Sequence, residues 1–561
     1  MLDVDSLFPA DLSEPEHWEQ QYPPRDLPEG AEVTRFGPSP TGFVHIGGVY
    51  VAMIDQDVSA RTGGRYLVRV EDTDQSREVE GALAQFERAF DYFRIQPTEG
   101  EGSNDGAGDY GPYLQSAREP IYLTYVRHLL RQGRAYLCFA TRDELADITA
   151  RQQAAKVPPG YYGTWAIWRD ADDDRVREEL AKGTPYVVRF RAPDEAAGQR
   201  ARFTDAIRGE LEHEANRNDV VILKSSDQAV RLPTYHFAHA VDDHLMRTTL
   251  VIRGEEWISS VPLHLQLFDA LGFAPPRYAH IAPLMKQIPG GKRKLSKRKD
   301  PEASVDFYIS AGYPADAVLY YLRGLANGRL AELPLAEALV EPIHLAECGV
   351  AGPLVDLVKL EDISADHVAT LTGEQILDAV RVWAATHDAE LVPVLDANRD
   401  LALRALAVER DGVENPRKDL RKWSDFRPAY GFFFAELFTP VTDAADERLG
   451  GLDPRLVQAF LADFADGYQP LEDGREWFDQ IRQLAAKHGF APNPKEFKKN
   501  PDAYPGSIRE ASQLVRVTLT GSTRSPDLHA VATTLGPAEV RRRLSATVRD
   551  DAASIPGVDP H

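Results

Sequence analysis

The first regular pattern along the chain is a strand, a helix and a second strand. Residues 33–36 form a short apolar strand pattern that halts at a Pro-rich turn. The apolar face of the helix that follows is supplied by Val49, Met53 and Ile54. Gly63 and Gly64 end this helix, and residues 66–70 form a buried-strand pattern. This order is typical of a parallel α/β unit, as in half of a Rossmann-like sheet.

A second half of the sheet resumes far downstream. Residues 249–252 form a β-branched apolar strand, and residues 279–285 run into a basic loop. That loop contains Lys286, Lys292, Arg293, Lys294, Lys297, Arg298 and Lys299. Between the halves, residues 111–226 mix helical and strand-like patches, as an insertion would. The sequence therefore predicts an α/β fold with a split Rossmann-like sheet.

Beyond about residue 350 the strand pattern fades and apolar positions recur at helical spacing. Examples are Leu456, Val457, Phe460, Leu461 and Phe464, and then Trp477, Ile481, Leu484 and His488. The last third is predicted to be all helical. Residues 1–30 are expected to form an irregular lead-in, and the Gly- and Asp-rich residues 99–111 a flexible loop.

Composition narrows the class of protein. The 561 residues fit about three to five domains. With 43% hydrophobic and 27% charged residues, neither general disorder nor a membrane span is favoured. The net charge of −23 means that contact with nucleic acid would be local. Only Cys138 and Cys348 are present and no secretory signal is visible, so we expect a soluble cytoplasmic protein.

Three predicted strands end in a charged residue, namely Arg35, Glu71 and Arg253. Open parallel sheets bind ligands beyond the carboxyl ends of their strands, so these charges can converge on one ligand. Each of them alone could be a solvated strand end. The three together indicate a site.

Two further motifs suit a bound phosphate. His45, Gly47 and Gly48 open the first helix, where glycine allows close backbone approach and free N–H groups can receive an anion. The cationic residues 294–298 follow a Gly-Gly pair and suit a clamp on a triphosphate. Each motif is weak evidence alone, and their order along the chain strengthens both.

Several motifs occur in a fixed order. Residues 34–42 read Thr-Arg-Phe-Gly-Pro-Ser-Pro-Thr-Gly and are followed by His-Ile-Gly-Gly at 45–48. Further motifs lie at 69–74, 111–113, 233–235, 241–246, 251–257 and 294–299. This ordered set resembles the bacterial glutamyl-tRNA synthetases, a class I family. The resemblance is strong over roughly residues 33–360 and weaker over the tail.

The resemblance implies a reaction and a set of site residues. Glutamate would attack Mg·ATP to give glutamyl-adenylate, and the glutamyl group would then pass to tRNA(Glu). Catalytic roles would fall to His45, Lys294 and Lys297. The implied ATP-binding residues are His45, Gly47, Gly48, Lys294, Ser296 and Lys297. The implied glutamate-binding residues are Arg35, Ser39, Glu71, Tyr235, His239 and Arg253, with the arginines on carboxylates and Glu71 near the ammonium group.

The resemblance also implies an organisation into a Rossmann-like class I catalytic domain with a connective insertion and an all-helical anticodon-binding region. The segments are an N-terminal extension (1–30), two catalytic halves (31–110 and 221–285), the insertion (111–220), a signature loop with a stem-contact region (286–350) and two helical anticodon-binding domains (351–460 and 461–561). A monomer is expected. Candidate tRNA contacts in the tail are Arg417, Lys418, Arg421, Lys422, Lys495, Lys498, Lys499, Arg541, Arg542 and Arg543.

This sequence departs from the family pattern at two places. The family commonly has Asn where this chain has His239. Some members bind zinc through several cysteines in the insertion, whereas Cys138 has no cysteine partner, so no structural zinc is expected.

Other functions stay open at this point. A glutaminyl-tRNA synthetase would have β-barrel anticodon domains, whereas this tail is predicted to be helical. A tRNA-modifying relative would lack the helical domain, whereas about 200 residues follow the catalytic half. The intact ATP motifs speak against a catalytically silent RNA-binding protein. A metallohydrolase could use the imidazoles and carboxylates of His236, His239, Asp242, Asp243 and His244, although most of this segment also occurs in the family.

Overall fold

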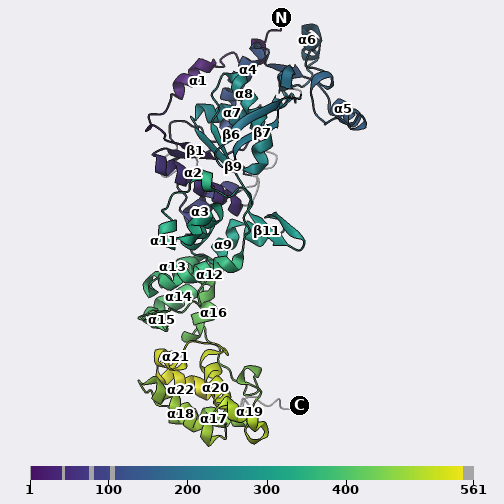
Figure 1. Ribbon diagram of the computed structural model, residues 1–561. Coiled ribbons are helices and arrows are strands. Elements are labelled where there is room, and N and C mark those ends of the chain that lie inside the picture. Colours follow the sequence, from purple (N-terminus) through teal and green to yellow (C-terminus); the bar gives the residue numbers. More distant parts are fainter. Residues whose placement is uncertain (1, 41–43, 75–80, 101–107, 197, 548–561) are drawn as a thin grey trace, which may run out of the picture. The chain divides into compact units, whose positions relative to one another are not determined.

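The computed structural model describes residues 2–40, 44–74, 81–100, 108–196 and 198–547. Two residues of the first motif, Thr41 and Gly42, lie outside these ranges. The chain forms two compact units (Figure 1): one holds the residues up to Ile309 and Val318–Asp356, and the other holds Ser310–Ala317 and the residues from Leu357 on. Within the described ranges, no helix is long and apolar enough to cross a membrane.

The centre of the first unit is a parallel sheet in two halves, as the sequence predicts. In the first half β1 (Val33–Phe36) pairs with β2 (Arg65–Val68), which pairs with β3 (Glu99–Gly100), all parallel. In the second half β9 (Leu250–Gly254) pairs in parallel with β10 (Arg277–Ile281). The halves meet where the Thr249 N–H donates to the Val33 carbonyl over 3.0 Å.

A hairpin extends the second half of this sheet. The strands β6 (Arg200–Asp205) and β7 (Gly209–Glu214) are antiparallel, and β6 reaches β10 in parallel through the pair Asp205 and Tyr278. These strands lie in the segment that the sequence assigns to the insertion, but they complete the nucleotide-fold sheet. The carboxyl end of β6 at Asp205 therefore lies beside Tyr278, near the start of β10.

Helices cover this sheet and shape its edge. Helix α2 (Ile46–Thr62) packs against β1 and β2, begins at His45 as N-cap and ends at Gly63 with φ 68°. The helix and its glycine end agree with the sequence prediction, since only glycine adopts this backbone without strain. The other helices that lie wholly in the first unit are α1 (Pro15–Gln21), α3 (Ala82–Phe93), α4 (Glu119–Arg131), α5 (Arg142–Ala154), α6 (Asp173–Ala181), α7 (Tyr235–Leu245), α8 (Val261–Leu271) and α11 (Leu335–Ala338).

The insertion has its own antiparallel sheet in the order β4 (Ala135–Cys138), β5 (Val187–Phe190) and β8 (Val221–Leu223). Its buried side chains join α4, α7 and α8 in one hydrophobic cluster. This shared core fixes the insertion on the helices that follow it in sequence.

Three local expectations are wrong. The lead-in contains the helix α1, whose end residue Tyr22 is buried in the core, because its aromatic side chains reach α4 and the hydrophobic cluster. The expected flexible loop begins with the buried strand β3, while residues 101–107 lie outside the described ranges. The start of the expected basic loop is a hairpin of β11 (Met285–Ile288) and β12 (Gly291–Lys294), which turns at Gly290 with φ 87°.

The second unit contains no β-strand among its described residues, in agreement with the predicted helical tail. Helices α9 (Val305–Ala311) and α10 (Ala315–Ala326) lie across the boundary between the units. The helices beyond them are α12 (Leu357–Thr370), α13 (Gly373–His387), α14 (Leu391–Ala397), α15 (Arg399–Ala407), α16 (Phe426–Tyr430), α17 (Pro454–Gly467), α18 (Gly474–Lys487), α19 (Pro494–Lys499), α20 (Ile508–Thr520), α21 (Leu528–Leu535) and α22 (Pro537–Ala546).

Two hydrophobic clusters organise these helices. One forms around α13 to α16 and the other around α17, α18, α20 and α22. The apolar positions noted in the sequence at Val457, Phe460, Leu461 and Phe464 are buried in the second cluster. The helical spacing therefore identified the core face of α17 correctly.

Candidate functional site

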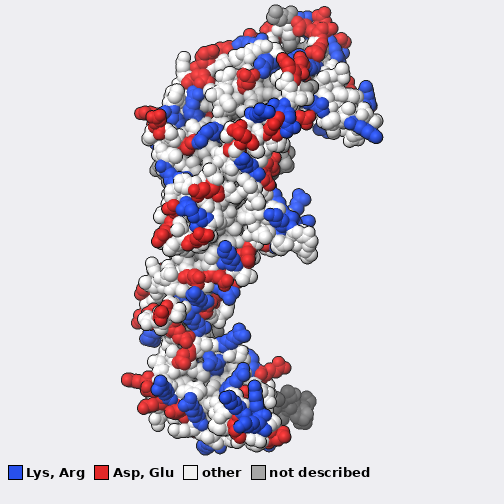
Figure 2. Space-filling model, in the orientation of Figure 1, with Lys and Arg blue, Asp and Glu red and all other residues white. Residues whose placement is uncertain are grey.

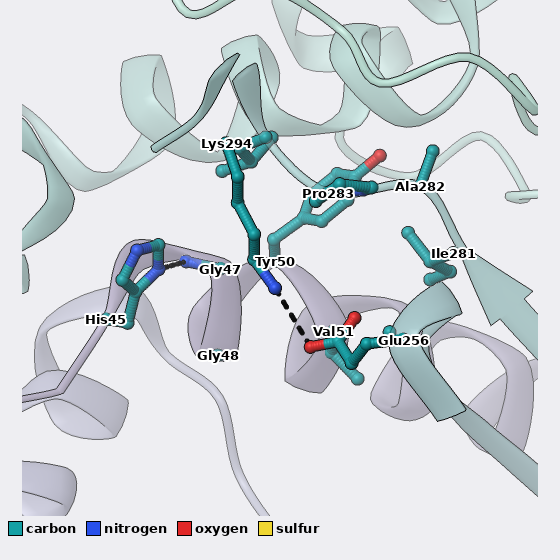
Figure 3. Close-up of a pocket in the computed structure, with 12 residues that line it drawn as sticks. His45, Gly47, Gly48, Tyr50, Val51, Glu256, Ile281, Ala282, Pro283 and Lys294 are labelled. Carbon is teal, nitrogen blue, oxygen red and sulfur yellow. Dashed lines mark hydrogen bonds and ion pairs between the residues drawn. The ribbon is translucent and has the colours of Figure 1, made fainter. Parts of the chain in front are cut away.

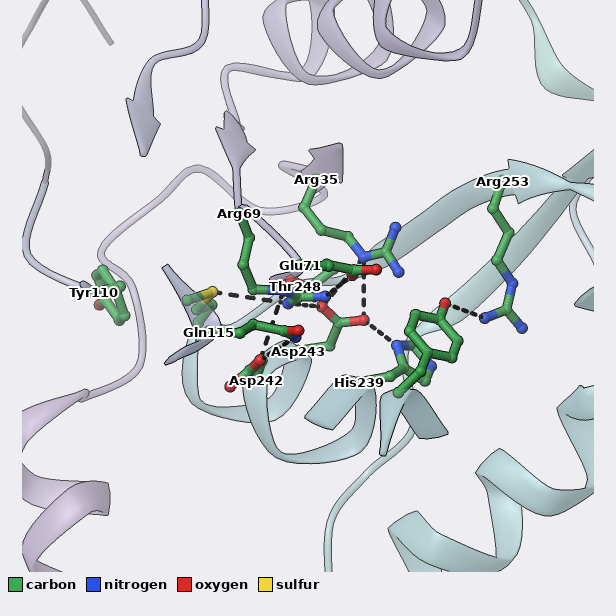
Figure 4. Close-up of polar contacts among 12 residues, drawn as sticks. Arg35, Arg69, Glu71, Tyr110, Gln115, His239, Asp242, Asp243, Thr248 and Arg253 are labelled. Carbon is green, nitrogen blue, oxygen red and sulfur yellow. Dashed lines mark hydrogen bonds and ion pairs between the residues drawn. The ribbon is translucent and has the colours of Figure 1, made fainter. Parts of the chain in front are cut away.

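A buried carboxylate gathers the charges at the ends of β1 and β2 (Figure 4). Asp243 of α7 accepts from Arg35 Nε over 3.2 Å and from Arg69 Nη1 over 2.5 Å, and its Oδ2 lies 2.6 Å from His239 Nδ1. Burial alone would raise the pKa of Asp243, but Arg35, Arg69 and His239 lower it well below its usual value. The site is therefore built around a fixed negative charge.

Glu71 lies beside this cluster and is held by Arg69, whose Nη2 donates to Glu71 Oε1 over 3.1 Å. Burial raises the pKa of Glu71, while Arg69 and Arg35 oppose that rise. The backbone of Gly37 passes so close that a Cβ there would lie 2.5 Å from Glu71 Oε1. Only glycine at position 37 leaves room for this carboxylate.

Arg253 at the end of β9 has different partners. Its Nε donates to His280 Nε2 over 3.1 Å, its Nη1 to the Tyr235 hydroxyl over 3.4 Å, and its Nη2 lies 3.2 Å from His264 Nδ1. The residue is 6% exposed, yet none of the ion pairs between described residues includes it. A buried cation without a counter-ion is unfavourable, so this guanidinium suits an anionic ligand.

The other residues expected around glutamate lie near these charges or on the adjacent turn. The Tyr235 ring lies between Trp257, at 4.4 Å between centroids, and His239, at 6.0 Å. His239 is fully buried; its Nε2 lies 3.0 Å from the Tyr278 hydroxyl, and its Nδ1 lies close to Asp243 without hydrogen-bond geometry. Burial lowers the pKa of His239 to about 3, and the ring is neutral at pH 7. Ser39 is exposed on the turn after β1.

A pocket of about 290 Å³ opens at the N-terminus of α2 (Figure 3). It is lined by His45, Gly47, Gly48, Tyr50, Val51, Gly254, Glu256, Ile281, Ala282, Pro283, Leu284 and Lys294. The His45 and glycine motif thus shares one cavity with the ends of β9 and β10. The N-terminus of a 17-residue helix provides partial positive charge for an anion bound there.

His45 is the N-cap of α2, and its Nδ1 accepts the Gly47 N–H over 2.8 Å. This hydrogen bond assigns the ring proton to Nε2. Burial lowers the pKa of His45, the Leu295 backbone raises it, and the charges of Lys297 and Lys294 lower it further. The structure therefore brings the two expected ATP motifs within electrostatic reach of each other.

The cationic loop lies against the same pocket. Lys294 Nζ pairs with Glu256 Oε1 over 2.9 Å (Figure 3), and the Val305 N–H donates to the Val44 carbonyl over 3.1 Å, which holds the end of the loop beside His45. Ser296 and Lys297 lie in the adjoining turn and are not among the residues that line this pocket. Partial burial of its ammonium group lowers the pKa of Lys297, although the residue as a whole is exposed.

The sequence analysis missed several functional side chains. The imidazoles of His264 and His280 at Arg253 had no recognisable spacing, and Glu256 was noticed within the motif at 251–257 but given no role. Asp243 was noticed in the motif at 241–246 and in the metal alternative, but it was given no role in the glutamate site. The sequence signal for Asp243 was the pair of Asp residues that lies on one helix. Both carboxylates are fully buried in the structure, and buried carboxylates require cationic partners.

The structure separates the residues of that metal alternative. His239 contacts Asp243, Asp242 accepts from Arg118 over 2.7 Å, and His244 lies 2.7 Å from Glu19. Successive residues of α7 face different neighbours, so these side chains diverge. In the described part of the chain, no group of three or more His, Cys, Asp or Glu residues could hold a metal ion.

The candidate tRNA contacts of the tail fall into different classes. Lys495, Lys498 and Lys499 of α19 are exposed, and Figure 2 shows Lys and Arg side chains gathered over this region. Another group makes ion pairs with acidic neighbours, namely Arg417, Lys418, Arg421, Lys422 and Arg542. Arg541 donates to the Tyr468 carbonyl. Arg543 was wrongly proposed: it is fully buried, because its face of α22 turns inward, and it donates to the Leu519 carbonyl over 2.5 Å.

Comparison with known proteins gives a consistent set of matches. Residues 32–341 match the model of the catalytic domain of class I tRNA synthetases (E and Q), and residues 507–548 match an anticodon binding domain. Glutamate–tRNA ligases of Clostridium beijerinckii and Sorangium cellulosum are each 40% identical to the chain, over 94% and 96% of its length and 96% and 98% of theirs. A solved glutamate tRNA ligase from Elizabethkingia meningosepticum, in complex with its amino acid, has a TM-score of 0.72 at 26% identity and covers 92% of this chain and 99% of its own.

Proposed function

The chain belongs to the glutamate–tRNA ligases, which are class I tRNA synthetases of the E and Q type, and from this premise we propose how its own residues activate glutamate and select it. The reaction joins the α-carboxylate of glutamate to the α-phosphate of ATP, releases pyrophosphate, and then transfers the glutamyl group to the 3′ end of tRNA(Glu). The alternatives of a glutaminyl-tRNA synthetase and a tRNA-modifying relative receive no support from these relatives. The matched anticodon binding domain also argues against the second.

The observation that carries the proposal is the buried guanidinium of Arg253 without a carboxylate partner. None of its three hydrogen-bonding partners carries a negative charge, and its other contacts are the rings of Tyr278 and Trp257, so a substrate carboxylate would supply the missing counter-ion. Guanidinium groups hold carboxylates with two parallel hydrogen bonds, which gives both strength and direction.

Arg35 offers a second set of donors. It gives only Nε to Asp243, and its terminal nitrogens point away from Asp243 toward the side on which Arg253 lies (Figure 4). We assign the two carboxylates of glutamate to these two arginines. Glu71 is assigned to the ammonium group, with Tyr235 and His239 forming one wall and Ser39 lying at the entrance.

The ATP-binding role falls to the pocket at α2. We propose that Gly47 and Gly48 allow the phosphates to approach the helix N-terminus, that neutral His45 donates from Nε2, and that Lys294, Ser296 and Lys297 close over the triphosphate. Placing donors and cations where charge develops is the main way in which such sites accelerate phosphoryl chemistry. Lys294 would exchange Glu256 for a phosphate oxygen.

Magnesium ion fits this pocket as a companion of ATP. Among the described residues that line the pocket, Glu256 is the one carboxylate and is paired with Lys294, so protein ligands there are few. This suits a cation that takes most of its oxygens from phosphate and water. When bound, the ion would neutralise charge on the triphosphate.

The surroundings of Cys138 support the proposal that this chain has no structural zinc. Its sulfur lies 3.3 Å from Arg189 Nε and 3.4 Å from the Tyr161 hydroxyl. A guanidinium beside the thiol disfavours a second cation, and a zinc site needs further thiolate or imidazole ligands. The segment boundaries given above, a monomeric state and a cytoplasmic location remain predictions.

The glutamate assignment can be tested with Arg253→Gln. Activation of glutamate should fall steeply, while the use of glutamine relative to glutamate should rise, because an amide no longer meets a buried cation. Arg277→Gln is the matched control, since Arg277 begins the neighbouring strand with a 63% exposed side chain. If Arg253→Gln kept the glutamate preference and the KM for glutamate, Arg253 would be a structural strand end.

A further inference from the structure

The hydrogen bond that holds Arg253 Nε depends on which ring nitrogen of His280 carries the proton. The Arg253 Nε–H can donate to His280 Nε2 only while that nitrogen carries a lone pair. His280 is fully buried on β10, so water cannot replace the contact. The opposite tautomer would place an N–H against an N–H and push the guanidinium away.

Asp205 fixes this tautomer from the other side of the ring. Its Oδ2 lies 2.6 Å from His280 Nδ1, and the side chain of Asp205 is completely buried. Burial alone would raise the pKa of Asp205, but the bonds from His280 and from the Ile207 and Arg208 N–H groups lower it below its usual value. An ionised carboxylate only accepts hydrogen bonds, so the ring proton lies on Nδ1 and Nε2 is left as the acceptor for Arg253.

We propose that Asp205, at the end of the β6 strand that completes the sheet, positions Arg253 through His280 and thereby sets the affinity of the site for the substrate carboxylate. Asp205 and His280 are positioning residues, because they would act on the substrate only through Arg253. The proposal rests on the assignment of Arg253 to a glutamate carboxylate made above. It explains why a hairpin within the expected insertion is joined to the nucleotide-fold sheet.

The two oxygens of Asp205 have different main partners, although they share the His280 backbone N–H. Oδ1 accepts from the N–H groups of Ile207 and Arg208, each over 3.0 Å, and so shapes the turn between β6 and β7. Oδ2 faces the His280 ring and also accepts the His280 backbone N–H over 3.1 Å; the same backbone nitrogen lies 3.3 Å from Oδ1. In Asp205→Asn the amide nitrogen is least favourable at the Oδ1 position, where the N–H groups of Ile207, Arg208 and His280 converge, and less unfavourable at Oδ2, where only the His280 N–H points. At Oδ2 it donates to the His280 ring and favours the tautomer that carries its proton on Nε2.

The test is the steady-state charging of tRNA by the full chain. For Asp205→Asn we expect the KM for glutamate to rise about tenfold or more, as for the loss of a hydrogen bond to a charged group. The KM for ATP should stay close to the wild type. The thermal unfolding midpoint should fall, because the amide nitrogen meets a backbone N–H at either oxygen position, but a purely structural role would affect the KM values of all substrates together.

The effect of Asp205→Asn is also measured in a protein that already carries His280→Gln. Its amide can rotate to present oxygen to Arg253 whichever side chain occupies position 205. The effect of Asp205→Asn on the KM for glutamate should therefore largely vanish in the double variant, as coupling through a shared contact requires. Equal effects in both backgrounds would overturn the proposal, and so would a folded Asp205→Asn protein with a wild-type KM.

The tautomer can also be read directly, even if Asp205→Asn proves unstable. In protein labelled with ¹⁵N-histidine, the His280 signals are identified among the 15 histidines by their loss in His280→Gln. Protonation at Nδ1 is expected, and protonation at Nε2 would overturn the proposal. Arg253→Gln distinguishes failure of the carboxylate assignment from failure of the positioning role. A wild-type KM for glutamate in Arg253→Gln would refute the carboxylate assignment. A raised KM in Arg253→Gln together with a wild-type KM in Asp205→Asn would refute only the positioning role.

Discussion

Asp300→Ala should slow glutamate activation much more than it weakens glutamate binding. Asp300 follows the signature lysines and accepts two hydrogen bonds from Arg293, at 2.6 and 2.7 Å, and one from the Ser296 N–H at 2.9 Å. Lys286 adds an ion pair at 3.3 Å. The bonds to Arg293 come first among the causes that place the pKa of Asp300 well below its usual value. This carboxylate therefore holds the turn that carries Ser296 and Lys297.

The size of the effect follows from the exposure of the partners. Removing one member of a fully buried ion pair costs about 3 to 5 kcal/mol. Arg293 and Lys286 are 27% and 35% exposed in their side chains, so water will compensate part of that loss. The closed loop would then be destabilised by about 2 kcal/mol. If the closed loop is needed only in the transition state, this corresponds to a roughly thirtyfold lower rate.

The assay is single-turnover formation of glutamyl-adenylate with tRNA present, at saturating glutamate and ATP. Glu302→Gln is the control, because Glu302 contacts the same Lys286 but not the backbone of the signature turn. We expect a thirtyfold slower step for Asp300→Ala, with the KM for glutamate nearly unchanged and only a small effect of Glu302→Gln. Equal and small effects of both variants would refute the reasoning and show that Asp300 does not order the signature turn.

Three further predictions concern the ATP motifs and the tail. Lys297→Ala should slow activation about a hundredfold in single-turnover assays while the KM for glutamate stays near its wild-type value, since about 3 kcal/mol is typical of a lost transition-state contact. Burial and the charges of Lys297 and Lys294 hold the pKa of His45 below 6.5, so the activation rate should fall only when the pH drops below that value. In Lys297→Ala one of these charges is gone, so the acid limb of the pH–rate profile should move to higher pH. An acid limb that does not move would contradict the coupling between His45 and Lys297. Replacing Lys495, Lys498 and Lys499 with Gln should raise the KM for tRNA and reduce its salt dependence, measured by charging at several salt concentrations, whereas a wild-type salt slope would exclude α19 from the contact.

Much of the fold follows from local sequence pattern. The strand of residues 33–36 and the helix ending at Gly63 were predicted with nearly correct bounds, because buried parallel strands and glycine-ended helices leave strong local signals. The short strand β3 escaped prediction, since two residues within a Gly- and Asp-rich stretch carry no periodicity. Its pairing with β2 is a tertiary effect.

The candidate site was predicted where charge meets a strand end or a glycine turn. The strand-end position of Arg253 was visible in the sequence, but its partners His264 and His280 were not, because they come from α8 and β10 and meet Arg253 only in the folded chain. Arg543 is an example of the opposite error, a residue that was predicted to be at the surface but is buried. A basic residue on an amphipathic helix is usually exposed, and only packing reveals that this one points inward, with its guanidinium over the Phe438 ring at 3.8 Å.

The central claim is that this chain activates glutamate and attaches it to tRNA. The most direct measurement is attachment of labelled glutamate or labelled glutamine to purified tRNA(Glu) and tRNA(Gln), with ATP and magnesium ion. The account predicts ATP-dependent attachment of glutamate to the 3′ end of tRNA(Glu) and no comparable use of glutamine. Preferred attachment of glutamine to tRNA(Gln), or failure to charge either tRNA with glutamate, would contradict it.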